Sequence, residues 1–370
     1  MTYDCIVLGV GGAGSAALYH LARRGANVVG IDRFAPGHDR GSSHGRTRMI
    51  RLAYFEHPDY VPLLRRAREL WLELEKEKGA PLYRETGVVQ IGARDGMVVS
   101  GVLEAARRHG LDVEEIERGG LPGLAWPESM TAVFERQAGL LSVEECVRAH
   151  AALAQAHGAE LRIGEAVVGW SADGDGVEVQ TESARLRAQR LVVTPGAWAA
   201  DLLGDLGVPF RVLRKAQFWF ATEVEQHTVD GGLPCFYFEL DDGHFYGFPK
   251  IDELGLKLAQ HSGGTEVDDP FTADRGIDAQ EQARVVAFLA AHLPGASTTP
   301  THHEVCFYTM TPDEHFIVDR HPRHPQVALA AGLSGHGFKF ASVLGEVLCD
   351  LTLDGATRHP IGFLCLSRFD

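Results

Sequence analysis

The chain has 370 residues, 45% of them hydrophobic, and a formal net charge of −15 at neutral pH. Single hydrophobic cores usually stop growing at about 250 to 300 residues. Because this chain is longer, we expect two lobes. The acidic balance disfavours binding to nucleic acid or to a membrane surface, because both partners are anionic.

No apolar stretch approaches the ~18 residues of a membrane span, and strand-like sequence begins at once, so we expect neither a membrane segment nor a signal peptide. The six cysteines are scattered and form no C-x-x-C pair, which favours reduced thiols. Together these features predict a cytoplasmic protein.

The first 32 residues follow a dinucleotide-binding order. Residues 5–8 are a short apolar run, and a G-x-G-x-x-G motif follows directly with Gly9, Gly11 and Gly14. Small and apolar residues over 13–21 predict a helix that ends near a left-handed Gly25. A second strand over 27–31 then leads to Asp32. This succession predicts a Rossmann-type βαβ unit.

Each part of this unit has a physical role. Gly9 permits the tight turn, Gly11 lets the backbone approach a pyrophosphate, and Gly14 allows close packing of helix and strand. Asp32 would accept hydrogen bonds from a ribose, and an acid at this position disfavours the 2′-phosphate of NADP. The motif alone leaves both FAD and NAD open.

The following segments predict a loop and then a helix. Residues 34–45 are rich in Pro, Gly, Ser, Asp and His, and Arg46, Arg48 and Arg51 follow within six residues. This basic segment is either a solvated loop or an anion-binding segment beside the cofactor. Apolar residues at helical spacing predict an amphipathic helix over 60–78, stopped by Gly79.

The middle of the chain alternates between predicted helices and strands. We expect a strand over 87–92, a helix over 98–109, and a capping box at Ser142–Glu145 that opens a helix to about residue 157. Two strands surround a turn at residues 173–176. Residues 190–193 predict a buried parallel strand that ends in a glycine turn beside the nucleotide.

Strand-like, aromatic-rich sequence dominates residues 212–258, and a helix is predicted over 281–292. Residues 327–332 predict a returning strand of the nucleotide domain, before a glycine turn and a helix over 338–351. The predicted class is therefore α/β, with a Rossmann-like domain interleaved with a substrate domain on a mostly antiparallel sheet. We assign residues 1–80, 143–211 and 309–370 to the first domain, and 81–142 and 212–308 to the second.

Several patterns have ordinary explanations. Residues 41–45 match G-x-S-x-G, but no apolar strand precedes them, which excludes a hydrolase nucleophile elbow. The 18 histidines show no metal-ligand spacing. Cys306 fits a buried structural thiol, and Lys257, alternating with leucines, is predicted to face solvent. Lys339 at a helix start is unfavourable unless an anion is near, which hints at a ligand.

Three stretches of sequence carry a family resemblance: residues 41–51 with Tyr54 and Glu56, residues 246–261, and residues 306–340. They make the chain resemble the monomeric sarcosine oxidase and N-methyltryptophan oxidase family over essentially its whole length. Residues 341–346 and the Leu-Ser-Arg-Phe at 366–369 look closer to the N-methyltryptophan oxidase branch.

The resemblance implies FAD bound covalently through a thioether from Cys306. The implied cofactor-binding residues are Gly9, Gly11, Gly14, Asp32, Ser42, His44, Thr47, Cys306 and Gly335. The implied substrate-binding residues are Arg51 and Lys339, which would hold a carboxylate, with Tyr246, Tyr237 and Glu56. The implied catalytic residues are Arg48, Lys257, His261 and Tyr308.

The implied reaction removes a hydride equivalent from an N-methyl carbon. It gives an imine that hydrolyses to formaldehyde and the primary amino acid, while oxygen becomes hydrogen peroxide. The implied partners are therefore a small N-methyl amino acid and oxygen, and the implied assembly is a monomer, with no metal.

Two residues depart from the family pattern. Arg46 stands where the family usually has aspartate, and Tyr237 where sarcosine oxidases have methionine. Sarcosine, N-methyltryptophan, other N-alkyl amino acids and pipecolate-like imino acids remain open as substrates. A nicotinamide-dependent dehydrogenase and a nucleotide-binding protein without catalysis are the alternatives from other classes.

Overall fold

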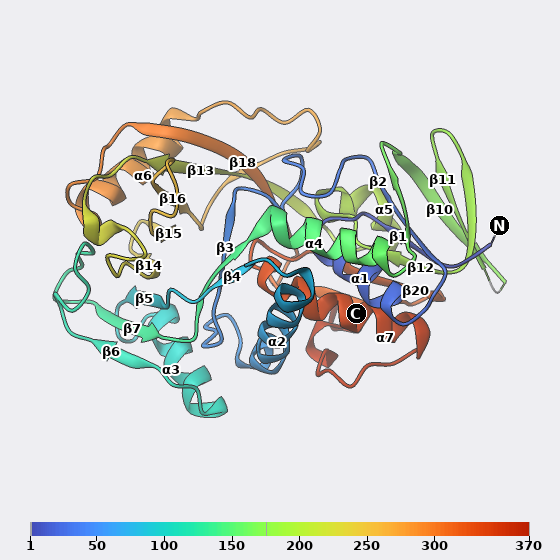
Figure 1. The fold of residues 1–370 in the computed structure, drawn as a ribbon, viewed down its shortest axis with the longest axis horizontal. Helices are drawn as coiled ribbons and strands as arrows, with labels where there is room; N and C mark the ends of the chain where they lie inside the picture. The colour runs from blue at the N-terminus through green and yellow to red at the C-terminus, as the bar shows by residue number, and fades with distance from the viewer. Residues whose placement is uncertain (1, 175, 370) are drawn as a thin grey trace.

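The computed structural model describes residues 2–174 and 176–369, which form two lobes built on separate sheets (Figure 1). The first sheet has eight strands, and its main path runs β10-β11-β12-β1-β2-β9. Strand β20 pairs with the end of β12, and β19 pairs with β20. The strands are β1 (Tyr3–Leu8), β2 (Val28–Asp32), β9 (Glu160–Ile163), β10 (Val167–Asp173), β11 (Gly176–Thr181), β12 (Arg185–Val193), β19 (Ile317–His321) and β20 (His324–Ala331).

The predicted βαβ unit is confirmed within this sheet. Strands β1 and β2 are parallel, and α1 (Gly12–Arg23) connects them. Gly25 has a φ of 81°, as expected for a glycine just past a helix end. Strand β12 lies parallel to β1 and β20, so segments from both termini and from the middle of the chain meet in one sheet.

The second sheet has nine strands and is mostly antiparallel, as predicted. Its main path runs β17-β13-β16-β15-β14-β5-β7-β6, with β18 on the other edge of β13, and only β5 and β14 pair in parallel. The strands are β5 (Val88–Gly92), β6 (Glu114–Ile116), β7 (Thr131–Glu135), β13 (Arg211–Phe220), β14 (Cys235–Leu240), β15 (Gly243–Phe248), β16 (Leu256–Gln260), β17 (Thr265–Glu266) and β18 (Pro300–Met310). Helices α3 (Met97–His109) and α6 (Ala279–His292) belong to the same lobe (Figure 1).

A small third sheet corrects the loop interpretation of the basic segment. Residues Thr47–Ile50 form β3, which pairs antiparallel with β8 (Gly139–Ser142), and β8 also pairs with β4 (Tyr83–Arg84). A strand forms here because β8 supplies backbone partners that the local sequence cannot reveal. The side chains of the segment are consequently held in fixed directions.

The remaining helices are α2 (Val61–Lys78), α4 (Val143–Ala156), α5 (Ala199–Leu203) and α7 (Ala341–Leu353). Helix α2 ends at Gly79 as predicted. Ser142 is the N-cap of α4, but its side chain makes no capping hydrogen bond, so the predicted capping box is wrong. Glu144, the neighbour of the predicted box residue Glu145, accepts hydrogen bonds from the backbone N–H groups of Gly45 and Arg46.

Short 3₁₀ turns complete the elements. One of them, Phe338–Phe340, replaces the first turn of the helix predicted to begin at residue 338. The turns are Pro58–Tyr60, Gly196–Trp198, Gly204–Leu206, Glu225–His227, Phe338–Phe340, Gly362–Leu364 and Leu366–Phe369.

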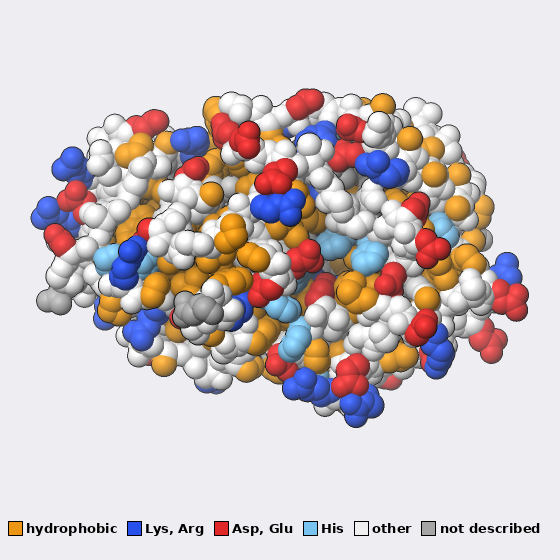
Figure 2. All heavy atoms as spheres, turned by 180° about the vertical axis from the view of Figure 1, so that it is seen from behind, with side chains coloured by type: hydrophobic (Ala, Val, Ile, Leu, Met, Phe, Trp, Pro, Cys, Tyr) orange, Lys and Arg blue, Asp and Glu red, His pale blue; other side chains and the backbone are white. Residues whose placement is uncertain are grey.

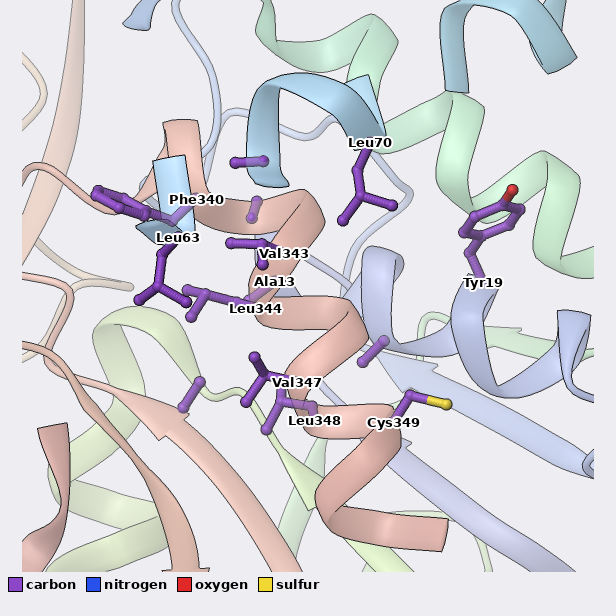
Figure 3. Close-up of a cluster of buried hydrophobic side chains, with 14 of the residues drawn as sticks. Ala13, Tyr19, Leu63, Leu70, Phe340, Val343, Leu344, Val347, Leu348 and Cys349 are labelled. Atoms are coloured by element: carbon purple, nitrogen blue, oxygen red, sulfur yellow. The ribbon is translucent and has the colours of Figure 1, made fainter. Parts of the chain in front are cut away.

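The core of the first lobe lies between the sheet and helices α1, α2 and α7. Figure 3 shows the apolar side chains of α7 facing residues of α2, including Leu63. Helices α1 and α7 approach closely because Gly345 has no side chain: a Cβ there would lie 2.5 Å from the Cβ of Ala16. This packing fixes the start of α1, where the glycine motif lies, against the segment that leads into α7.

The surface shows mixed charge. On the face opposite to Figure 1, acidic and basic side chains are interspersed and form no continuous basic patch (Figure 2). Among the described residues, no helix is both long and apolar enough to cross a membrane. Asp175 of the predicted turn at 173–176 lies outside the described residues, and the domain limits given above stay a prediction.

Candidate active site

One cavity of about 550 Å³ runs from the glycine motif to the second sheet. At the glycine end its wall includes Gly9, Gly11, Gly12, Gly14, Asp32, Ser42 and Ser43. At the other end it includes Arg48, Arg51, Glu56, Tyr237, Tyr246, His261, Tyr308, Gly335, His336 and Lys339. The structure therefore brings most of the predicted site residues together around one space.

The three motif glycines have distinct surroundings. Gly9 has a φ of 84°, and a Cβ on it would lie 2.3 Å from the carbonyl oxygen of Thr194. A Cβ on Gly14 would lie 1.8 Å from the carbonyl oxygen of Gly9, whereas one on Gly11 would meet only the Ser43 hydroxyl, at 4.0 Å. Gly9 and Gly14 thus serve the packing, and Gly11 leaves the backbone open to the cavity.

Asp32 lies at the end of β2 and lines the cavity. Its carboxylate accepts hydrogen bonds from the N–H groups of Val10 at 2.7 Å and Phe34 at 2.8 Å. Burial raises the pKa of this carboxyl, against the lowering effect of those two hydrogen bonds. Asp32 therefore orders the turn and retains acceptor capacity toward the cavity.

Arg51 is the most confined cation in the wall. Its side chain is 3% exposed, and its Nη2 donates to both oxygens of Glu56, at 2.8 and 3.0 Å. The guanidinium carbon lies 4.4 Å from the ring centroids of both Tyr54 and Phe55. Its Nη1 is buried without a hydrogen-bond partner. A buried charged donor without a partner is costly, so this atom marks a position for an anionic ligand.

Lys339 supplies a second buried cation on the 3₁₀ turn before α7. Its Nζ donates to the carbonyl oxygen of His336 at 2.8 Å and lies 3.4 Å from the Tyr54 hydroxyl. Burial lowers the pKa of Lys339 to about 7, with Arg51 lowering it further and Glu56 raising it. Burial would raise the pKa of Glu56, but Arg51, His336 and Lys339 hold it below its usual value. Two cations thus face one carboxylate.

Aromatic and imidazole rings form the rest of this end of the cavity. His261, directly after β16, hydrogen-bonds through Nδ1 to the Tyr308 hydroxyl at 3.2 Å. Burial, with Lys215 nearby, lowers the pKa of His261 well below its usual value, so its ring is neutral. Tyr237 packs between Phe55 and His261, with ring centroids at 5.2 and 5.7 Å, and its hydroxyl contacts His244.

Lys257 corrects the prediction of a solvated side chain. It is 2% exposed, and its Nζ donates to the carbonyl oxygens of Gly45 at 2.6 Å and Thr47 at 2.9 Å. It also lies 5.0 Å from the ring centroid of Phe248. Alternation along β16 predicted the wrong environment because the face opposite the leucines is covered by the segment leading into β3. Burial, followed by repulsion from Arg48, lowers the pKa of Lys257 well below its usual value.

Arg48 is fixed by backbone oxygens at the cavity wall. Its Nη1 donates to the carbonyl oxygen of Thr47 at 2.9 Å, and its Nη2 to that of Ser42 at 3.0 Å. Thr47 and Lys257 are not in the wall but lie behind it.

Arg46 points away from the site. Its side chain is 41% exposed and pairs with Asp252. The departure from the family aspartate therefore changes surface charge rather than cavity charge.

Cys306 and His44 also lie behind the wall. The Cys306 sulfur is buried and accepts a hydrogen bond from Gln217 Nε2 at 2.9 Å, while Gln217 Oε1 has no partner. His44 pairs through Nδ1 with Glu304 at 2.9 Å, and its Nε2 is likewise buried without a partner. The six cysteines are all free thiols.

Sequence reasoning missed three residues that shape this site. His336 contacts Tyr54 and lines the cavity, and its flanking glycines were the available signal. Gln217 is a buried amide in an apolar strand, which is a detectable exception to the pattern. Glu135 is buried and accepts the N–H groups of Leu52 and Ala53, but no local signal could link it to the residues that follow Arg51.

Comparisons with known proteins agree with this geometry. A family model described as FAD dependent oxidoreductase matches residues 4–351. The chain is 43% identical to monomeric sarcosine oxidase of Streptomyces avermitilis, over 98% of this chain and 96% of that protein. It is 35% identical to N-methyl-L-tryptophan oxidase of Escherichia coli K12, over the full length of both. The C-terminal residues resemble the N-methyltryptophan oxidase branch, whereas identity over the whole chain is higher to this sarcosine oxidase.

Solved structures show the same architecture. NikD, an unusual amino acid oxidase essential for nikkomycin biosynthesis, superposes in its open form with a TM-score of 0.87 at 25% identity, covering 98% of this chain and 97% of NikD. Glycine oxidase from Geobacillus kaustophilus gives a TM-score of 0.81 at 22% identity, covering 99% of each chain, and shows the fold alone.

Proposed function

This chain belongs to the family of FAD-dependent oxidoreductases that includes the monomeric sarcosine oxidases and N-methyl-L-tryptophan oxidases, and from that premise we propose that it oxidises N-methyl amino acids. The proposed products are the primary amino acid, formaldehyde and hydrogen peroxide, from one molecule each of substrate, oxygen and water. The observation that carries the proposal is the buried pair Arg51 and Lys339 at the aromatic end of the cavity.

The residues present fit FAD. The cavity begins at the N-terminus of α1, where the N–H groups of a helix's first turn suit a pyrophosphate, and Gly11 leaves that approach open. Asp32 has the acceptor oxygens that ribose hydroxyls need. Behind the wall, His44 Nε2 and Gln217 Oε1 are buried without partners, and Gln217 Nε2 donates to the Cys306 sulfur. We propose that these groups hold FAD, with Cys306 as the covalent attachment.

The carboxylate of the substrate is proposed to bind between Arg51 and Lys339. Arg51 Nη1 is a free donor in a buried setting, and the second cation leaves this group with an excess of positive charge beside Glu56. Charge-assisted hydrogen bonds of this kind fix a ligand's orientation as well as its affinity. The rings of Tyr237 and Tyr246 would then contact the rest of the substrate.

Bound FAD would accept the two electrons removed from the N-methyl carbon and pass them to oxygen. The protein's part is to present a neutral amine and exclude water. His261 is uncharged, so its ring can hydrogen-bond to the neutral substrate amine, and the Tyr308 hydroxyl fixes the orientation of that ring. Arg48 would add positive charge near Cys306, where it would stabilise negative charge that develops during reduction. Lys257 lies beside Arg48, and its lowered pKa disfavours its charged form.

A peroxide-coupled screen tests the activity. Purified protein should be yellow and should release hydrogen peroxide with sarcosine, N-methyltryptophan or another N-alkyl amino acid. Absence of peroxide across that panel, together with pipecolate-like imino acids, would refute the proposed reaction. NADH turnover by a colourless protein would instead favour the nicotinamide-dependent alternative, which the family match disfavours.

Acid precipitation tests the covalent attachment separately. The yellow colour should stay with the precipitated wild-type polypeptide and pass into the supernatant for Cys306→Ala. Cys235→Ala is the matched control, because Cys235 is also a buried thiol but contacts Thr86 instead of Gln217. Retention of colour by Cys306→Ala would exclude Cys306 as the attachment point.

We also propose that the protein is a monomer. Relatives named monomeric sarcosine oxidase support this proposal.

A further inference from the structure

Lys215 is a buried cation that the proposed chemistry does not use. It lies on β13 directly opposite Cys306 of β18, and its side chain is turned away from solvent, with 4% exposure. Its Nζ donates to three consecutive carbonyl oxygens, those of His261 at 2.8 Å, Ser262 at 2.9 Å and Gly263 at 2.9 Å. These bonds use all three donors of the ammonium group.

The chain after β16 is shaped to receive this ammonium. Gly263 and Gly264 have φ values of 65° and 118°, which let successive carbonyl groups point the same way. A Cβ on Gly264 would lie 3.0 Å from Lys215 Cδ, so the glycine also makes room for the lysine stem. On its other side, the His261 N–H donates to the carbonyl oxygen of His244 at 2.6 Å. The backbone of His261 is thus held at both its N–H and its carbonyl group.

Lys215 also contacts the partner of His261. Its Nζ lies 5.2 Å from the ring centroid of Tyr308, within the range of a cation–π interaction. One side chain therefore touches both residues of the His261–Tyr308 hydrogen bond without lining the cavity itself.

We propose that Lys215 is a positioning residue that holds His261 against Tyr308 at the substrate end of the cavity. The inference rests on the proposed function, in which that pair acts on the substrate amine. Lys215 acts through the backbone of one residue and the ring of the other, so it sets the geometry of the pair rather than touching the substrate.

The charge of Lys215 gives the proposal a pH signature. Burial lowers the pKa of Lys215 to about 8, while Cys306 on β18 and Glu281 on α6 raise it and Arg284 on α6 lowers it. Below that pH the ammonium donates to all three carbonyls, and above it the neutral amine has one donor fewer. The neutral side chains that face it, His261 and Tyr308, carry no charge that would replace it. The kcat of the saturated enzyme should therefore fall as pH rises through about 8.

Steady-state peroxide release by the holoenzymes tests this between about pH 6 and pH 10. Lys215→Met should lower kcat by roughly tenfold or more with little change in KM, because a misplaced catalytic pair costs rate rather than carboxylate binding. Lys215→Gln keeps donors but does not titrate, so it should recover part of kcat and lose the decline near pH 8. Lys250→Met is the control, because Lys250 also donates to a backbone carbonyl, that of Thr222, away from the cavity wall.

Crystal structures of the same variants make the test independent of turnover. The 3.2 Å contact between His261 Nδ1 and the Tyr308 hydroxyl should be lost in Lys215→Met and kept in Lys250→Met. A retained contact in Lys215→Met, or a kcat profile unchanged in both Lys215 variants, would overturn the inference. A wild-type enzyme that releases no peroxide would refute the proposed function alone, and the crystal structures would still decide the role of Lys215.

Discussion

Buried charges dominate the site at the scale of single residues. Arg51 and Lys339 approach each other from segments far apart in the chain, and Glu56 offsets only part of their charge. Removing one member of such a group leaves the others unpaired in a poorly solvated space. The proposed binding of a carboxylate between Arg51 and Lys339 would offset the cost of burying this excess positive charge.

Loss of either cation should weaken the reaction of carboxylate-bearing substrates. Arg51→Ala and Lys339→Ala should each lower kcat/KM for N-methyl amino acids by about tenfold or more, since a charged hydrogen bond contributes ~1.4 kcal/mol or above. Arg46→Ala serves as the control, because Arg46 pairs with Asp252 at the surface. Peroxide kinetics with sarcosine measure the effect. Equal kcat/KM in all three variants and the wild type would remove Arg51 and Lys339 from the site.

The pKa of Lys339, about 7, predicts how ligand binding depends on pH. Protonated Lys339 attracts a carboxylate and the neutral form does not, so the Kd should rise as pH increases above about 7. A small carboxylate without an amine, such as methoxyacetate, avoids titration of the ligand and can be followed by the flavin absorbance. Lys339→Met should bind more weakly and show no such rise; a parallel pH dependence in the variant would assign the effect to another group.

At the scale of elements, strand β3 and helix α1 position the residues at the two ends of the cavity. Strand β3 carries Arg48, and the segment that follows it carries Arg51 before turning back at residues clamped by Glu135. The start of α1 places the glycine motif, and its close approach to β1 depends on missing side chains. Both arrangements depend on the position of the backbone, so a substitution that shifts the backbone there should disturb them.

Two glycine substitutions should separate folding from cofactor binding at the start of α1. Gly14→Ala places a Cβ 1.8 Å from a backbone oxygen and should destabilise the protein by about 1–3 kcal/mol or more. Gly11→Ala meets no atom closer than 4.0 Å, so it should leave the Tm of the apoprotein unchanged. In a Cys306→Ala background, where FAD would bind reversibly, it should raise the Kd for FAD. Thermal unfolding and FAD titration measure the two effects. Equal loss of Tm in both variants would contradict the assignment.

At the scale of the whole molecule, the two lobes are built from interleaved segments of the chain. Each large sheet collects strands from distant parts of the chain, and the cavity lies where the two lobes meet. The helices that cover the first sheet also bury His20 and His150, neither of which has a full set of hydrogen-bond partners. These histidines couple the stability of the whole fold to pH.

The protein should lose stability below about pH 6.5. Burial lowers the pKa of His20 to about 4, so the unfolded chain binds a proton there at higher pH than the folded protein does. The stabilisation is complete above the unfolded pKa and is lost as pH falls toward the folded one. Between about pH 7.5 and pH 5.5, His20 alone should account for a loss of about 1 kcal/mol in the free energy of unfolding.

Denaturant unfolding at both pH values measures this loss. His20→Gln should reduce the difference between the two pH values by about 1 kcal/mol, whatever its effect at either one. His57→Gln should not, because the His57 side chain is 40% exposed. An undiminished difference in His20→Gln would show that other groups, such as His150, carry the acid sensitivity.

The sequence by itself determined the βαβ unit, most of the elements and the family. Each of these depends on local periodicity or on short motifs such as Gly9–Gly14, whose physical requirements are confined to neighbouring residues. The same local reasoning failed for Lys257 and Ser142. The segment before β3 shields Lys257, and Ser142 pairs with Thr47 in the small third sheet, a partner far away in the sequence.

Only the tertiary structure decided which residues share the cavity and how they are charged. Arg51, His261 and Lys339 are more than seventy residues apart from one another in the sequence. Only the packing of the folded chain brings them to one cavity wall. Their pKa values follow from burial and from charges on other elements, which no local pattern encodes. The chemistry available to this protein is therefore a property of the folded chain, whereas its nucleotide-binding motif can be recognised from the sequence.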